Sequence, residues 1–169
     1  MLHAPLARWV PAYVGLGSNL DDPVARLEQG LAAVGRLPGT RLVLASPFYW
    51  NPPLGVRPQP EYLNAVAGLL TTLDPRRLLD GLLSIEREHG RERPRAERWA
   101  PRTLDLDLLV YGRERFAEPG LTLPHPGIAE RNFVLFPLAD MAPDLDIPGL
   151  GRVAGLLAGV TREGLRRHA

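Results

Sequence analysis

The chain has 169 residues, of which 45% are hydrophobic and 23% are charged. This length and balance are typical of a packed soluble protein, and we expect residues 1–169 to form a single domain. Cysteine is absent, which excludes disulfides, zinc-thiolate sites, iron-sulfur clusters and thiol nucleophiles. All 20 basic residues are arginine, and the lack of lysine excludes a Walker-type phosphate loop and Schiff-base chemistry.

The formal net charge is only +1, which gives little reason to expect non-specific binding of nucleic acid. The first residues contain no apolar run of signal-peptide length, and no stretch of about 18 uncharged apolar residues follows. We therefore expect a cytoplasmic protein that binds neither nucleic acid nor a membrane, and we take a monomer as the expected state.

The first half of the chain predicts a strand, a helix and a second strand. Residues 9–16 are rich in β-branched and aromatic residues, as strands are. Asp22 and Pro23 then form an N-cap followed by proline at the first helical position, and the apolar spacing continues the helix towards Gly39. Residues 42–49 predict the second strand, and four prolines within 51–60 predict a structured loop.

The same order repeats in the middle of the chain. Residues 62–73 predict a strand, and Asp74 with Pro75 begins a helix that ends near Gly90. A charged segment follows, and residues 103–111 alternate as a strand does. Smaller elements are expected as an extra strand near 116, a loop over 123–126, and short helices over 133–141 and 153–157.

The order strand, helix, strand, strand, helix, strand is that of a split βαβ unit. We therefore predict an α+β, ferredoxin-like fold with a mainly antiparallel sheet, helices on one face and mobile loops over the other. The open face is left for a ligand, and the proline loop and the charged segment are long enough to cover it.

Two carboxylates stand out in the strand predicted over 103–111. Because side chains alternate, Asp105 and Asp107 point to one face with Leu109, and the leucines between them point to the core. Like charges in one patch cost stability unless a divalent cation lies between them. Magnesium fits, since it binds through one or two carboxylates plus substrate phosphates. A solvated outer strand face explains the same spacing.

The segment before this strand is rich in arginine. Six arginines and four glutamates lie within residues 86–102, and i,i+4 pairing on a solvated helix end explains the helical part. Beyond the helix, the guanidinium groups of Arg91, Arg98 and Arg102 are suited to bind phosphate oxygens beside a metal. Trp99 is either a core anchor or part of a lid that closes on a planar ligand.

Weaker signals lie elsewhere in the chain. The Gly-Leu-Gly at 15–17 lacks the third glycine of a dinucleotide fingerprint, and a strand that ends in a tight turn explains it. His125 lies between two prolines, although a lone histidine is more often structural than catalytic. Tyr62, Asn64 and Phe133 are able to frame a flat heterocycle, but each alone is most simply a core residue.

Five segments share their residues and their order with one enzyme family. They are residues 13–20, 52–65, 101–107, 121–126 and 130–133, and the Pro-Arg-Thr-Leu-Asp-Leu-Asp of 101–107 is the most specific. Together they resemble the 6-hydroxymethyl-7,8-dihydropterin pyrophosphokinases of folate biosynthesis, over residues 13–143. The resemblance implies transfer of pyrophosphate from ATP to the pterin hydroxymethyl group, with release of AMP and with two Mg²⁺ ions.

The resemblance also implies roles for individual residues. Asp105 and Asp107 would hold both metal ions, and Arg91 and Arg102 would act in catalysis beside them. The pterin would be contacted by Asn51, Pro52, Leu54, Tyr62, Asn64, Trp99 and Phe133. ATP would be contacted by Glu86, Arg91, Arg98, Arg102, Thr122, His125 and Arg131.

Four positions depart from the family pattern, namely Leu83, Ala100, Gly127 and Asn132. They leave open the detail of the nucleotide contacts and the stiffness of residues 90–102. We expect residues 90–102 to be a lid that becomes ordered only when nucleotide and pterin are both bound.

Two other functions are compatible with the same topology. An RNA-binding module would need stacking aromatic residues on its central strands, where this chain has Asp105, Asp107 and Leu109. A different metal-dependent nucleotidyl transferase or a cyclase would also place two strand aspartates on magnesium, and its products would distinguish it.

Overall fold

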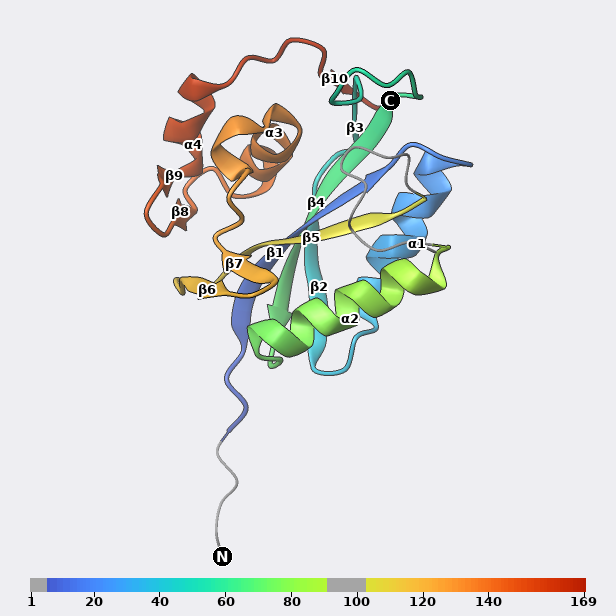
Figure 1. Cartoon of the computed structure of the whole chain (residues 1–169). Coiled ribbons are helices and arrows are strands. Elements are labelled where there is room, and N and C mark those ends of the chain that lie inside the picture. Colours follow the sequence, from blue (N-terminus) through green and yellow to red (C-terminus); the bar gives the residue numbers. More distant parts are fainter. Residues whose placement is uncertain (1–5, 91–102) are drawn as a thin grey trace, which may run out of the picture.

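The computed structural model describes residues 6–90 and 103–169, and a six-stranded sheet forms its centre (Figure 1). The strands of this sheet are β1 (Val10–Ser18), β2 (Thr40–Ala45), β3 (Tyr49–Asn51), β4 (Tyr62–Thr71), β5 (Asp105–Tyr111) and β10 (Arg166–Arg167). The helices are α1 (Pro23–Gly35), α2 (Pro75–Glu88), α3 (Asn132–Met141) and α4 (Val153–Leu156). Two small hairpins pair β6 (Phe116–Glu118) with β7 (Leu121–Leu123), and β8 (Asp146–Ile147) with β9 (Gly151–Arg152).

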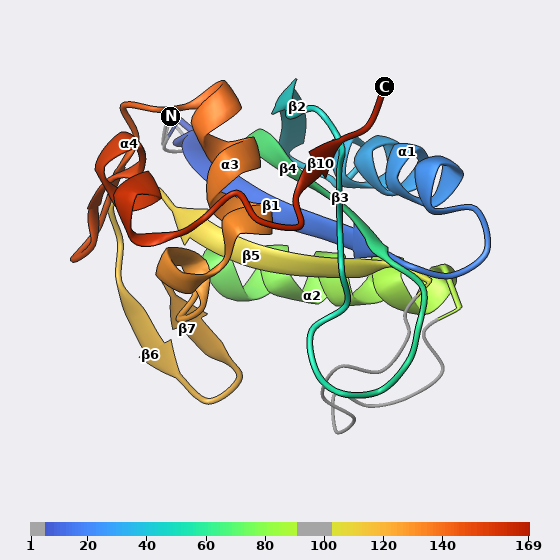
Figure 2. The same ribbon diagram turned by 90° about the horizontal axis from the view of Figure 1, so that it is seen from above.

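The sheet confirms the predicted fold class. β1 pairs antiparallel with both β4 and β5, and β4 pairs antiparallel with β2 and β3. The helices α1 and α2 lie together on one face, at the lower right of Figure 1. On the opposite face, for which only loops were expected, α3 packs against β4 and β3 (Figure 2). Within the described ranges, no helix is long and apolar enough to cross a bilayer.

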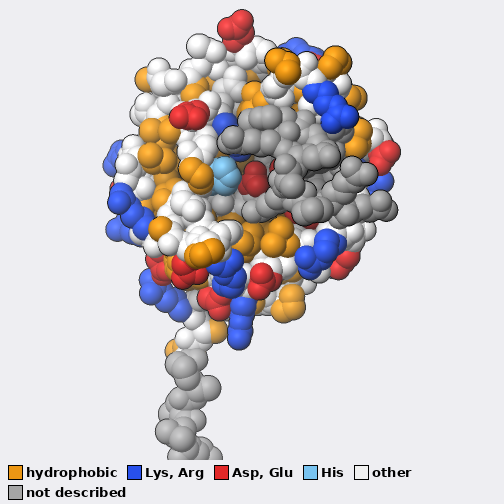
Figure 3. All heavy atoms as spheres, viewed as in Figure 1, with side chains coloured by type: hydrophobic (Ala, Val, Ile, Leu, Met, Phe, Trp, Pro, Cys, Tyr) orange, Lys and Arg blue, Asp and Glu red, His pale blue; other side chains and the backbone are white. Residues whose placement is uncertain are grey.

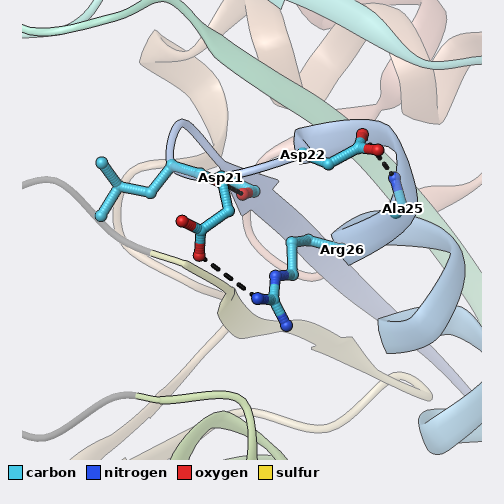
Figure 4. Close-up of polar contacts among 6 residues, drawn as sticks. Asp21, Asp22, Ala25 and Arg26 are labelled. Atoms are coloured by element: carbon cyan, nitrogen blue, oxygen red, sulfur yellow. Dashed lines mark hydrogen bonds and ion pairs between the residues drawn. The ribbon is translucent and has the colours of Figure 1, made fainter.

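Both predicted helix starts are confirmed by their capping bonds. The Asp22 carboxylate accepts a hydrogen bond from the backbone N–H of Ala25 at 3.1 Å (Figure 4). The Asp74 carboxylate accepts the equivalent bond from the N–H of Arg77 at 2.9 Å. Each such cap stabilises a helix by about 1 kcal/mol.

The strand predicted over 42–49 is instead two strands, β2 and β3, which are separated by residues 46–48. Pro47 has no N–H to donate to a ladder, so regular pairing breaks there. Ser46 secures the break, because its Oγ accepts a hydrogen bond from the N–H of Val66 at 2.9 Å. The sequence also gave no signal for β8, β9 and β10, which are two residues each.

Each face of the sheet carries its own buried cluster. The cluster under α1 and α2 includes Leu104, Leu106 and Leu108, as the alternation predicts. The other cluster, under α3, includes Leu109 and the adjacent Val110. The register of β1 against β5 shifts at this point, so that the extra residue Leu109 lets two successive side chains face the same side.

Candidate active site

The sheet face opposite α1 and α2, called here the site face, carries a row of polar and small residues across its strands. Asn64 in β4 lies opposite Gly17 in β1, and Gly17 lies opposite Asp105 in β5. Tyr49 in β3 extends the row on the far side of Asn64. One step along, Gly15 lies opposite Asp107. Cross-strand partners point to the same face, so this row brings the predicted pterin and metal residues together.

The glycines of the row lie inside β1 and not in the tight turn that the sequence suggested. A Cβ atom at Gly17 would come within 3.0 Å of Asn64 Oδ1. Glycine at this position therefore keeps the space between Asn64 and Asp105 open. The turn itself comes later, where Asp21 has a positive φ of 58° and its carboxylate pairs with Arg26 at 3.2 Å (Figure 4).

Asp105 and Asp107 are both half-buried on the site face, on either side of Leu106. The guanidinium of Arg131 approaches Asp107, with Nη1 at 4.0 Å from Oδ2. Within the described residues there is no cluster of three or more His, Cys, Asp or Glu that would cage a metal ion. Magnesium needs no such cage, because it binds through one or two carboxylates, water and substrate phosphates. The two aspartates therefore fit this ion.

Glu86 lies in α2, and its side chain is at 0% exposure. Its Oε1 accepts a hydrogen bond from the backbone N–H of Leu106 at 2.8 Å. A buried carboxylate is costly unless it is paired or hydrogen-bonded. Glu86 thus holds the backbone of β5 between Asp105 and Asp107.

The predicted pterin residues gather at the other end of the row. Asn64 and Asn51 are buried, and the side-chain amide of Asn64 donates to Asn51 Oδ1. Asn51 Nδ2 in turn donates to the carbonyl of Pro52 at 2.9 Å. Tyr62 lies opposite Asn51 in the β3–β4 pairing and is half-buried, while Leu54 is 38% exposed. These residues form a polar and partly apolar group at this end of the row.

The loop that carries Pro52 and Leu54 is fixed to the end of β1. Asn19 Nδ2 donates to Gln59 Oε1 at 2.9 Å and to the carbonyl of Pro60 at 3.1 Å. Asn19 is only 2% exposed, so the anchor is buried. In the sequence, this asparagine belongs to the segment 13–20 that resembles the enzyme family. Its partner Gln59 lies 40 residues away, and the segment alone did not show this contact.

Two of the predicted nucleotide residues, His125 and Arg131, follow β7 and approach the row from the β5 side. The backbone N–H of His125 donates to the carbonyl of Leu109 at 2.8 Å, which ties this loop to β5. The N–H of Gly127 donates to His125 Nδ1 at 3.0 Å, so a neutral ring carries its proton on Nε2. Figure 3 shows a histidine beside acidic side chains in a hollow of the surface.

Arg131 connects the two ends of the site. Besides its approach to Asp107, its guanidinium carbon lies 5.9 Å from the ring centre of Phe133. A Cβ at position 127 would come within 2.7 Å of Arg131 Nε, so Gly127 leaves this arginine room. Thr122 lies in β7 with an exposed side chain.

The remaining predicted site residues, Arg91, Arg98, Trp99 and Arg102, lie outside the described residues, as do residues 91–102 of the segment predicted to form a lid. The sequence reasoning missed the open positions at Gly15 and Gly17. It also missed the bond from the buried Tyr49 hydroxyl to Asp140, which joins β3 to α3. Glycine at every second position of a strand was the available signal for the open positions at Gly15 and Gly17.

The antiparallel α+β sheet, with carboxylates, an arginine and a histidine gathered on one face, is typical of enzymes that transfer phosphate-containing groups. The model of the 7,8-dihydro-6-hydroxymethylpterin-pyrophosphokinase family matches residues 13–143. The chain belongs to this family.

Two relatives are named 2-amino-4-hydroxy-6-hydroxymethyldihydropteridine pyrophosphokinase. The protein from Pseudomonas aeruginosa is 49% identical over 155 residues, which cover 92% of this chain and 94% of that protein. The protein from Haemophilus influenzae is 49% identical over 139 residues, which cover 82% of this chain and 86% of that protein.

Among solved structures, the wild-type HPPK-DHPS of Plasmodium falciparum with STZ-DHP gives a TM-score of 0.76 at 12% identity. The A437G form with SDX-DHP gives a TM-score of 0.75 at 15% identity. The matches cover 97% of this chain and 47% and 50% of those chains. This chain therefore spans about half the length of these structures, and the likeness shows the fold alone.

Proposed function

We propose that the site face is a platform for two substrates, with the pterin held around Asn64 and the triphosphate of ATP held around Asp105 and Asp107. The family's reaction transfers pyrophosphate from ATP to the hydroxymethyl group of 6-hydroxymethyl-7,8-dihydropterin, in folate biosynthesis. The single observation that carries the proposal is the row in which Asn64, Gly17 and Asp105 lie on adjacent strands.

The spacing of this row suits a pterin that lies between Asn64 and Asp105. Neighbouring strands lie about 4.8 Å apart, so the backbones at Asn64 and Asp105 are separated by about 10 Å. Gly17 adds no side chain between them. A bicyclic pterin fits into this interval with its ring edge at Asn64 and its hydroxymethyl group directed towards Asp105.

The pterin is held by hydrogen bonds and by aromatic contact. Because Asn64 Nδ2 donates to Asn51, the Oδ1 of Asn64 faces the space over Gly17 and accepts from a ring N–H of the pterin. Tyr62 and Phe133 supply flat apolar surfaces against the heterocycle, while Pro52 and Leu54 line the same pocket. Trp99 belongs to this set by family resemblance.

The triphosphate is held at the β5 end of the row. Asp105 and Asp107 would hold two Mg²⁺ ions, which when bound neutralise phosphate charge and orient the attacking hydroxyl towards the β-phosphorus. His125 donates from Nε2 to a phosphate oxygen, and Arg131 adds a positive charge beside Asp107. Thr122, Arg91, Arg98 and Arg102 complete the ATP and catalytic set by family resemblance.

Glu86 supports this platform from α2 through the backbone of β5. A side chain at 0% exposure that bonds the N–H of Leu106 fixes the backbone between the two proposed metal ligands. We therefore assign Glu86 to the nucleotide side as a positioning residue for Asp105 and Asp107.

The test is an assay of AMP formation from ATP and Mg²⁺ in the presence and absence of 6-hydroxymethyl-7,8-dihydropterin. We expect AMP to form only when the pterin is present, in equal amount to the pyrophosphorylated product. AMP formed equally without the pterin, or a cyclic nucleotide with pyrophosphate, would contradict the proposal. A titration of Mg²⁺ on the same assay tests the number of ions.

The proposal includes a cytoplasmic monomer that acts without nucleic acid. A net charge of +1 offers little attraction to a phosphate backbone. Sedimentation at assay concentrations tests the monomer, and a filter-retention assay with RNA over a range of salt concentrations tests the lack of nucleic-acid binding.

A further inference from the structure

The C-terminal residues 161–168, called here the C-terminal brace, run between the two sides of the proposed pterin pocket. They lie beyond residue 143, where the match to the family model ends. At their start they are fixed to α3, because Asn132 Nδ2 donates to the carbonyls of Thr161 at 2.9 Å and Glu163 at 3.2 Å. Asn132 immediately precedes Phe133, which forms one side of the pocket.

The other end of the brace is fixed to β3. Arg166 and Arg167 form β10 and pair antiparallel with Trp50 and Tyr49. The N–H of His168 donates to the carbonyl of Phe48 at 2.8 Å, and the indole Nε1 of Trp50 donates to His168 Nδ1 at 3.1 Å. A three-residue strand that would otherwise pair only with β4 is thereby held on both edges.

The middle of the brace lies against the pocket itself. Gly164 has a positive φ of 75°, and a Cβ there would come within 3.0 Å of Pro52 Cδ and 3.1 Å of Cγ. Pro52 is a proline of the pterin-side loop and directly follows Asn51. The adjacent Leu165 is buried at 6% exposure and anchors this turn in the protein.

We propose that the C-terminal brace fixes the width of the pterin pocket, with Gly164 and Asn132 as positioning residues for the pterin site. The brace bonds to β3 on one side of the pocket and to the first residue of α3 on the other, so both sides move together. Its residues act on the pterin through Pro52 and Phe133. This inference rests on the proposed placement of the pterin around Asn64.

The main test compares Gly164→Ala with Gly151→Ala. Both glycines have a positive φ, at 75° and 101°, so both variants carry backbone strain, but nothing lies within 4 Å of a Cβ at Gly151. Only Gly164→Ala forces Pro52 to move by a few tenths of an ångström.

We expect Gly164→Ala to raise the pterin dissociation constant at least about fivefold relative to Gly151→Ala, since misplaced positioning groups weaken binding steeply. The dissociation constant of a non-hydrolysable ATP analogue and kcat at saturating pterin should match in the two variants. Equal pterin affinities in the two variants, or an equal loss of ATP-analogue affinity in Gly164→Ala, would overturn the proposal. Calorimetry with each ligand measures these constants.

A second variant tests the other end of the brace. Asn132→Ala removes the N–H groups that bond to Thr161 and Glu163 and adds no charge beside Arg131. We expect it to weaken pterin binding and to leave ATP-analogue binding unchanged, and wild-type pterin affinity would count against the brace.

Asn64→Ala separates this inference from the proposed function. If Asn64→Ala weakens pterin binding and both brace variants bind pterin as the wild type does, the brace is wrong and the pocket stands. If Asn64→Ala leaves pterin binding unchanged, the pocket itself is wrong and the brace falls with it.

Discussion

The two faces of the central sheet are made from the same strands but carry opposite kinds of residue. On the face under α1 and α2, Leu63 in β4 and Leu106 in β5 are fully buried in a continuous apolar cluster. On the site face, the positions next to them are Asn64 in β4 and Asp105 in β5, with Gly17 between them. At this row one face is apolar and the other is polar, although the site face has a buried cluster of its own under α3.

The difference shows how a site of this kind is kept in place. A slip of one residue along a strand would exchange the two faces and bury the aspartates in place of the leucines. The apolar face forbids such a slip, so it also fixes the register of the polar row. The site face is further supported by the second cluster, in which α3 covers Val66 and Leu109.

The largest expected effect tests the polar face. We expect Asp105→Asn and Asp107→Asn each to lower turnover by more than about a hundredfold, since even groups that only support metal ligands cost ten- to hundredfold when removed. Without metal, the melting temperature should stay the same or rise, because one of two like charges is gone. Steady-state kinetics at saturating Mg²⁺ and thermal melts measure the two effects.

Asp80→Asn is the matched control, because this carboxylate is exposed on α2. It should leave turnover unchanged. Turnover close to that of the wild type in either Asp105→Asn or Asp107→Asn would remove the proposed metal site.

The apolar face should respond in the opposite way. Leu106→Ala is expected to lower the free energy of unfolding by about 2–5 kcal/mol, as other buried leucine truncations do. Val43→Ala, at a position that is 54% exposed, should change it by less than about 0.5 kcal/mol. Urea denaturation measures both, and equal effects would mean that Leu106 is not a core residue.

Asn64→Ala tests whether a buried polar residue of the row serves binding. We expect the pterin to bind more weakly by about 1–3 kcal/mol, because its ring edge loses a buried partner. ATP-analogue affinity should stay unchanged, and calorimetry with each ligand measures this difference. An equal loss for both ligands would point to general damage to the sheet.

Glu86→Gln and Glu86→Leu test whether Glu86, on α2, supports the aspartates of the site face through its bond to the backbone of β5. Gln keeps an acceptor for the N–H of Leu106, whereas Leu leaves that N–H without one. We expect Glu86→Leu to raise the Mg²⁺ concentration needed for half-maximal turnover by about tenfold, the lower range for groups that support metal ligands. Glu86→Gln should remain closer to the wild type than Glu86→Leu. An equal rise in the Mg²⁺ concentration needed for half-maximal turnover in both variants would contradict a role through the backbone bond.

The smallest effect concerns the alkaline limit of stability. Burial raises the pKa of the Tyr49 hydroxyl, and its hydrogen bond to Asp140 acts in the same direction. The unfolded chain therefore loses this proton first, near pH 10. The contribution of the protonated hydroxyl to the stability of the folded state is complete below that pH and is lost as the pH rises. We expect Tyr49→Phe to show a shallower decline above about pH 10. Urea midpoints across that range measure it, and a decline as steep as that of the wild type would contradict the expectation.

Much of the fold was readable from short stretches of sequence. Asp22 and Asp74 were predicted as helix caps, and both cap their helices. The alternation around Asp105 and Asp107 assigned the leucines between them to the core, which the structure confirms. Family resemblance gave the reaction, and the family match confirms it. Each of these signals depends on residues within a few positions of one another.

Other features became visible only when distant segments met. The row that joins Asn64, Gly17 and Asp105 unites residues 40 or more positions apart, and a glycine inside a strand looks locally like a glycine before a turn. The bond of Glu86 to Leu106 and the pairing of β10 with β3 depend in the same way on contacts across the fold. Local sequence determines caps and alternation because they depend on backbone geometry over a few residues. Strand neighbours are decided by the packing of the whole chain, and only the tertiary structure shows them.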